Sequence, residues 1–139
     1  MKLVSRGFAI TQHLAVTAIS VVLVTFAASS CTSHLQKARL AQGVQALGRY
    51  QLGMEQFYLA HGTYESATQA CGVPPPEPPK FFTFACETDG DSYRATLTGT
   101  GALSGYRYVL DDTATPHKTE LYEGVPVSKS CWLTREAHC

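Results

Sequence analysis

The sequence predicts an α+β fold in which one long N-terminal helix, its first half spanning a membrane, packs on a four-stranded antiparallel sheet reinforced by disulfides. Three observations support this prediction. Residues 8–30 contain no Lys, Arg, Asp or Glu, residues 40–58 have a single apolar stripe of helical period, and four later runs are rich in β-branched and aromatic residues. The 139 residues suit one domain with a modest core.

The charge-free segment, residues 8–30, follows a short leader that contains Lys2 and Arg6. As a helix it measures roughly 35 Å at about 1.5 Å per residue, which is enough to cross a hydrocarbon core of about 30 Å. Positive charge stays on the cytoplasmic side of a membrane, so we expect the N-terminus in the cytoplasm and the rest of the chain outside. Gln12 lies near the start of the segment, where polarity costs less than at mid-bilayer.

From Leu35 the pattern becomes amphipathic. Its apolar positions recur on one helix face, at Leu40, Val44, Leu47, Met54 and Tyr58. Gly62 is suited to a left-handed cap, so we expect the amphipathic helix of residues 31–62 to end at His61-Gly62. Residues 8–60 then read as one helix of about 80 Å, too long for a domain of this size to bury. We therefore expect part of this helix to be buried first in lipid and later against a partner.

Residues 63–139 are predicted to form a loop followed by a β-sheet head. The loop, residues 63–80, is proline-rich and is interpreted as a rigid connector, the alternative being a ligand for a proline-binding module. We expect strands at residues 81–86, 93–98, 106–110 and 118–122, because turn-forming residues separate these runs. The tail from residue 125 onward is expected to be irregular.

Four of the five cysteines lie beyond the predicted membrane segment, at Cys71, Cys86, Cys131 and Cys139. This location favours an oxidising compartment and a disulfide framework. Of the three pairings that four cysteines allow, Cys71–Cys86 and Cys131–Cys139 are favoured because each brackets a short loop. No C-x-x-C pair or close Cys/His cluster occurs, so neither a metal nor another cofactor is expected.

Charge is distributed unevenly although the chain is neutral overall. Residues 1–54 contain five basic residues and no acidic one, whereas residues 55–139 contain six basic and eleven acidic residues, a net charge of −5. A nucleic-acid-binding head usually shows the opposite bias, so nucleic acid is not an expected partner. The sequence has neither a phosphate-binding loop nor a catalytic Ser, Cys or His motif, so we do not expect an enzyme.

Several segments, taken in order, resemble the type IV pilins, in particular the minor pilin group. The resemblance covers nearly the whole chain. The residues that carry it are Gly7 followed by Phe8 and a long helix, His61-Gly62-Thr63-Tyr64, Phe81-Phe82-Thr83-Phe84-Ala85-Cys86, and Cys131-Trp132 with Cys139.

This resemblance implies processing and assembly. A membrane prepilin peptidase would cleave between Gly7 and Phe8, removing leader residues 1–7, and Phe8 would be N-methylated. The helix of residues 8–30 would anchor the chain in the inner membrane as a single pass, and would later bundle with other pilin subunits in an extracellular filament. Gln12 occupies the position where the family usually has Glu, the residue to which an assembly role is assigned. Gln12 brings no negative charge to this role, which fits a minor rather than a major subunit.

The expected function is therefore that of a minor structural subunit of a type IV pilus, contributing to assembly or priming, surface adhesion or twitching motility. Three alternatives remain open: an outer-envelope lipoprotein lipidated at Cys31, a type II secretion pseudopilin, and a DNA-uptake pilin. In a pilin, Cys31 would be a small buried helix residue. A further hypothesis pairs the basic helix residues Lys37, Arg39 and Arg49 with acidic heads of neighbouring subunits.

Overall fold

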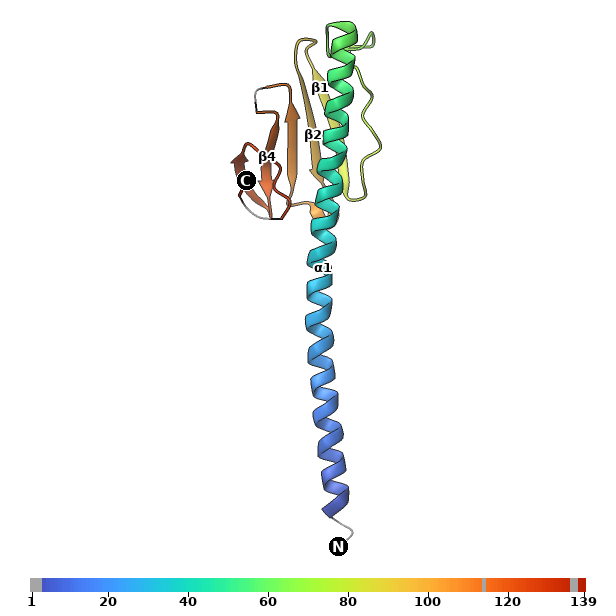
Figure 1. Cartoon of the computed structure of the whole chain (residues 1–139), viewed down its shortest axis with the longest axis vertical. Coiled ribbons are helices and arrows are strands. Elements are labelled where there is room, and N and C mark those ends of the chain that lie inside the picture. The colour runs from blue at the N-terminus through green and yellow to red at the C-terminus, as the bar shows by residue number, and fades with distance from the viewer. Residues whose placement is uncertain (1–3, 114, 136–137) are drawn as a thin grey trace. The chain divides into compact units, whose positions relative to one another are not determined.

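The computed structural model describes the backbone of residues 4–113, 115–135 and 138–139, and the side chains of residues 31–113, 115–135 and 138–139. Its elements are α1 (Val4–His61), β1 (Phe82–Thr88), β2 (Tyr93–Gly99), the 3₁₀ helix η1 (Gly101–Leu103), β3 (Arg107–Asp111), β4 (His117–Tyr122) and β5 (Val125–Lys129). The chain divides into two compact units, Met1–Gln36 and Lys37–Cys139. We call the second unit, which holds the sheet and the C-terminal part of α1, the head (Figure 1).

The predicted membrane segment, residues 8–30, belongs to α1, but its side chains lie outside the described residues. Among the side chains that are described, no helix combines the length and the apolar character needed to cross a bilayer. The membrane span therefore stays a prediction. The end of the helix is where the sequence predicts it, because Gly62 has φ +72° and its N–H donates to the carbonyl of Tyr58 at 2.7 Å.

The sheet has five antiparallel strands in the order β1-β2-β3-β4-β5, so the prediction of four strands is wrong. The fifth strand, β5, lies in the tail that was expected to be irregular. A tight turn at Glu123 and Gly124, both with positive φ, folds this segment back onto β4. The sequence does not predict this strand, because Pro126 lies inside it and most of its side chains are exposed. A proline within a strand is tolerated at the edge of a sheet, which is where β5 lies.

The core of the head lies between α1 and one face of the sheet, which we call the inner face. Leu40, Leu47 and Met54 of the predicted stripe are almost completely buried. Gly43 lets the helix approach closely, because a Cβ placed there would lie 2.8 Å from Leu97 Cδ2. Tyr58 departs from the prediction: it is 41% exposed and stacks on Tyr64 at the edge of the core.

Two disulfides cross-link the head, joining Cys71 to Cys86 and Cys131 to Cys139, the two pairs favoured from the sequence. The first ties the connector to β1. The hydroxyl of Tyr50 on α1 donates to the carbonyl of Val73 in the same connector at 2.8 Å. The proline-rich segment is therefore held against both the helix and the sheet.

Candidate functional site

The C-terminal disulfide loop is held at its base by buried polar side chains of the sheet. Thr119 Oγ1 donates to the carbonyl of Cys131 at 2.6 Å and accepts from the N–H of Leu133 at 3.0 Å. The hydroxyl of Tyr108 donates to the carbonyl of Leu133 at 2.6 Å. Burial raises the pKa of the Tyr108 phenol well above its ordinary value, so this hydroxyl remains a donor at physiological pH. The loop base is thus joined to β3 and β4.

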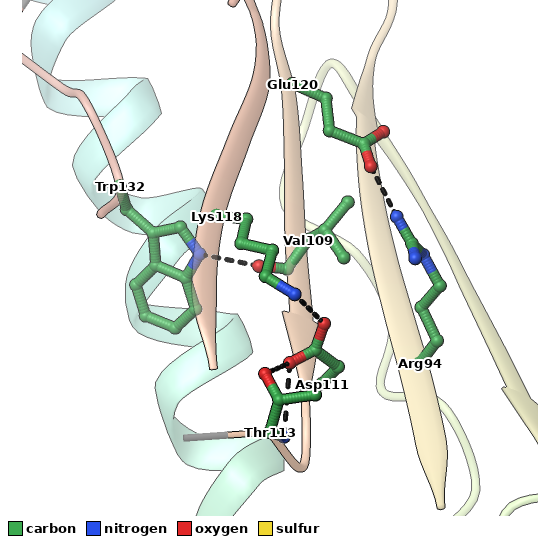
Figure 2. A network of polar contacts seen from close by, with 7 residues as sticks. All are labelled: Arg94, Val109, Asp111, Thr113, Lys118, Glu120 and Trp132. Carbon is green, nitrogen blue, oxygen red and sulfur yellow. Dashed lines mark hydrogen bonds and ion pairs between the residues drawn. The ribbon is translucent and has the colours of Figure 1, made fainter. Parts of the chain in front are cut away.

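Trp132 connects the same loop to the helix. Its Nε1 donates to the carbonyl of Val109 at 3.0 Å, as Figure 2 shows, and its ring lies 4.0 Å from that of His117, centroid to centroid. His117 Nε2 is in turn hydrogen-bonded to Gln51 Oε1 of α1 at 2.9 Å. Gln51, the polar residue that interrupts the apolar stripe, is therefore part of a chain of contacts from the helix to the C-terminal loop.

The outer face of the sheet, opposite α1, has two ion pairs (Figure 2). Arg94 on β2 forms an ion pair with Glu120 on β4, and Lys118 on β4 forms one with Asp111 on β3. The Arg94 and Glu120 side chains are 49% and 38% exposed, so their pair contributes little stability, about 0–1 kcal/mol. Val109, between these strands on the same face, is completely buried.

Asp111 is the one carboxylate among the described residues that is largely buried, with its side chain 9% exposed. Burial raises its pKa, but hydrogen bonds from Lys118 and Thr113 outweigh this effect, and the net pKa is lowered. The N–H of Thr113 reaches Asp111 Oδ1 at 3.2 Å and so closes the turn after β3. The carboxylate serves this turn and its ion pair, which is a structural role.

Charge also separates between the two ends of the head. The end formed by the turns after β1 and β3 has a groove of about 440 Å³ whose lining includes Glu87, Asp89, Asp111 and Asp112. At the opposite end, the cations Arg39 and Lys80 both lie over the ring of Phe81, with the guanidinium carbon 4.6 Å and the ammonium nitrogen 5.1 Å from its centroid. The acids of the groove share it with Arg94, whereas Arg39 and Lys80 form no ion pair with a residue that the structure describes.

The residues predicted for processing and assembly are not tested by this geometry. Gly7, Phe8 and Gln12 lie outside the residues whose side chains are described. Cys31 has an exposed free thiol, which corrects the expectation of a buried helix residue. No local pattern in the sequence indicates the contacts of Tyr108 and Thr119 with the C-terminal loop, because the residues that meet there are more than ten positions apart.

A family model described as "Type IV minor pilin ComP, DNA uptake sequence receptor" matches residues 29–107, which is more than half of the chain. The matched region begins in α1 and ends where β3 begins. No curated protein and no solved structure matches the chain.

Proposed function

Since the chain belongs to a family of type IV minor pilins, we propose that it is a minor structural subunit of a type IV pilus, anchored in the inner membrane before assembly and extracellular afterwards. The observation that supports this most directly is the family match, which runs from α1 into the sheet of a head held by two disulfides. Disulfides fit the oxidising side of the membrane, where a pilin head resides.

The proposed route begins with the leader. Prepilin peptidase removes residues 1–7, Phe8 becomes the N-methylated first residue, and residues 8–30 hold the chain in the membrane. The same charge-free segment then joins the helices of other subunits, because another apolar surface replaces the lipid. Gln12 accepts hydrogen bonds but brings no negative charge, which suits a subunit present in few copies.

The head suits a load-bearing role. Leu47 and Met54 on α1 are fully buried against the sheet, so a force on the helix reaches the strands through close packing rather than through a hinge. The C-terminal loop joins this unit through Trp132 and Tyr108. Such a rigid body is what a subunit needs to keep its place in a filament.

The test is the intact mass and N-terminal fragment of the mature chain from membranes and from sheared pili. We expect a chain that starts at N-methyl-Phe8 in both fractions, and a chain that retains residues 1–7 when prepilin peptidase is deleted. A mature chain that starts at a diacylated Cys31 would replace this proposal with a lipoprotein. A processed chain absent from sheared pili would favour a secretion pseudopilin.

A second candidate function is DNA uptake, which the description of the matching family names. The net charge of −5 over residues 55–139 argues against it, and so do the ion pairs of Arg94 with Glu120 and of Lys118 with Asp111. Arg107 shares the outer face with these two cations and is exposed. Binding to DNA phosphates requires such exposed cations. When they contact the phosphates, counterions are released from the DNA, so the affinity falls as the salt concentration rises.

Fluorescence anisotropy of labelled duplex DNA with the full chain in detergent tests this second candidate. A DNA receptor binds at low salt with an affinity that falls steeply as salt increases. Arg107→Gln should lower that affinity and the salt slope, whereas Leu52→Ala, an exposed helix control, should change neither. The absence of binding at low salt would remove DNA uptake as a function of this chain.

A further inference from the structure

The end of the head at which α1 enters is tied closely to the predicted membrane segment by the chain itself. Ser30 is the last residue of the charge-free segment, and Lys37 is the first residue of the head. The stretch from Ser30 to Lys37 spans roughly 10 Å as a helix and no more than about 25 Å in any conformation. The chain therefore keeps this end of the head near a membrane surface. We call it the base, and it comprises residues 37–39, 80–81, 100–107 and 123–125.

The base is built from segments that are distant in the sequence. The guanidinium carbon of Arg39 on α1 lies 4.6 Å from the ring centroid of Phe81, which directly precedes β1. The N–H of Thr100 donates to the carbonyl of Phe81 at 2.8 Å, so the segment that contains η1 joins the same end. The N–H of Gly124 donates to the carbonyl of Gly105 at 2.9 Å, which brings the turn between β4 and β5 to the start of β3. The fold therefore gathers four segments into one surface.

The base carries most of the free positive charge of this end of the molecule, with one acid among it. Its cations are Lys37, Arg39, Lys80 and Arg107, and its acid is Glu123. None of these cations forms an ion pair with a residue that the structure describes, whereas Arg94 and Lys118 on the outer face do. Glu77 of the connector lines a groove with Arg49, which lies farther along α1. The base therefore keeps a net positive charge, although residues 55–139 together have a net charge of −5.

Apolar side chains accompany the cations of the base. Phe81 has φ +71°, a left-handed conformation that is unusual for a bulky residue, and its partly buried ring holds Arg39 and Lys80 on it. Val125 at the start of β5 is 59% exposed. Cations placed beside exposed apolar groups are the combination that favours the interface between lipid headgroups and acyl chains.

The opposite end of the head is unsuited to such an interface. The turns after β1 and β3 form a groove whose lining includes Glu87, Asp89 and Asp112. Asp89 accepts hydrogen bonds from the N–H and the hydroxyl of Ser92, at 2.7 and 2.8 Å, and these bonds leave its negative charge in place. An anionic surface attracts the base and repels the acidic groove, so the charges give the head a preferred direction relative to a membrane.

We propose that before assembly the base binds the anionic phospholipid headgroups of the membrane that holds its own anchor. This inference rests on the proposed function, because it requires the membrane-anchored state of a pilus subunit. Lipid phosphates accept charge-assisted hydrogen bonds from guanidinium and ammonium groups. Each Lys or Arg near an anionic membrane strengthens such a contact by roughly fivefold. The anchor supplies a high effective concentration, and the contact needs only a single copy of the chain.

Fluorescence quenching of the full chain in lipid nanodiscs tests this contact. In a Cys31→Ser background, a fluorophore is attached at Ala102→Cys in the base or at Thr115→Cys in the loop after β3, and neither substitution alters a charge. The nanodiscs contain phosphatidylcholine alone or mixed with phosphatidylglycerol, and a trace of lipid with a spin-labelled headgroup quenches the fluorophore. Phosphatidylglycerol should increase quenching at Ala102→Cys but not at Thr115→Cys, and high salt should reverse the increase. Equal quenching at Ala102→Cys in the two lipid compositions would overturn the proposal.

Neutral substitutions test whether the cations of the base cause the contact. Lys80→Gln with Arg107→Gln should lower the ratio of docked to undocked heads by roughly 30-fold, which is two successive factors of about five. Arg49→Gln with Lys129→Gln removes the same charge from exposed positions outside the base, and this matched control should leave the quenching unchanged. An equal loss from both pairs would mean that net charge rather than the base is responsible. The comparisons of lipid and salt use none of these substitutions, so they remain decisive if a variant does not fold.

The outcomes distinguish this inference from the proposed function. A chain that is processed at Phe8 and present in sheared pili, but whose quenching ignores phosphatidylglycerol, contradicts the lipid contact and leaves the pilus role standing. A chain that responds to phosphatidylglycerol but is absent from pili contradicts the pilus role and leaves the lipid contact standing. Duplex DNA that abolishes the response at constant salt would assign the base to nucleic acid and overturn the proposal.

Discussion

The two faces of the sheet differ in how they are held. On the inner face, Leu47, Met54 and Leu97 are fully buried, and Gly43 allows the backbone of α1 to approach closely. On the outer face, exposed charges such as Arg94 on β2 and Glu120 on β4 pair across the intervening strand β3. Apolar burial is worth several kcal/mol per side chain, whereas an exposed ion pair is worth about 1 kcal/mol or less. The inner face therefore determines the fold, and the outer face and the two ends remain available for contacts with partners.

Truncation of the inner face should have the largest effect. Leu47→Ala removes a fully buried side chain and leaves a cavity, so we expect the free energy of unfolding to fall by about 2–5 kcal/mol. Urea unfolding of the full chain in detergent, followed by the fluorescence of Trp132, the single tryptophan, measures this loss. Leu52→Ala, at a position that is 60% exposed on the same helix, should change stability by less than about 0.5 kcal/mol. Equal losses of stability from Leu47→Ala and Leu52→Ala would contradict the conclusion that only the buried side of α1 stabilises the fold.

Loss of the C-terminal disulfide should rank second. Cys131→Ser or Cys139→Ser opens a loop with a sequence separation of 8, for which the chain-entropy model gives about 2–3 kcal/mol. Both variants should unfold at lower urea concentration and reach the cell surface in smaller amounts, which flow cytometry with an antibody to the head measures. Surface display at the wild-type level from both variants would rule out a structural role for this bridge.

Acid should weaken the partly buried ion pair of the outer face. The pKa of Asp111 is lowered in the fold from its ordinary value of 3.8, so the folded state binds fewer protons than the unfolded state around that pH. The stability that Asp111 contributes is therefore present above about pH 4 and is lost as the pH falls through its lowered folded pKa. Asp111→Asn should flatten the loss of stability between about pH 4 and pH 2. If the Asp111→Asn variant loses as much stability between about pH 4 and pH 2 as the wild-type chain does, Asp111 is not the cause of that loss.

Disruption of the exposed ion pair should have the smallest effect on stability. Glu120→Gln removes the partner of Arg94 and should cost less than about 1 kcal/mol, because both side chains are well exposed. Added salt should shrink even this difference, since exposed charges are screened. A destabilisation as large as that of Leu47→Ala would show that the outer face contributes to the fold as strongly as the core does.

Local signals in the sequence were sufficient for the helix and for most of the sheet. The apolar stripe of residues 40–54 predicted the face of α1 that is buried, and Gly62 predicted its end. Short loop lengths favoured the two disulfide pairs that the structure contains. The resemblance to minor pilins agrees with the family match over residues 29–107. These features depend on periodicity or on short spacing, and both can be recognised in the linear sequence.

The sequence by itself determined the long helix, the antiparallel meander and the uneven distribution of charge along the chain. Only the tertiary structure decided that β5 joins the sheet edge, that Gln51 reaches His117, and that Phe81 gathers Arg39 and Lys80. The physical reason is separation along the chain. A strand that pairs mainly through its backbone, or two side chains 66 positions apart, leaves no periodic pattern, because the contact exists only once the sheet has packed on the helix.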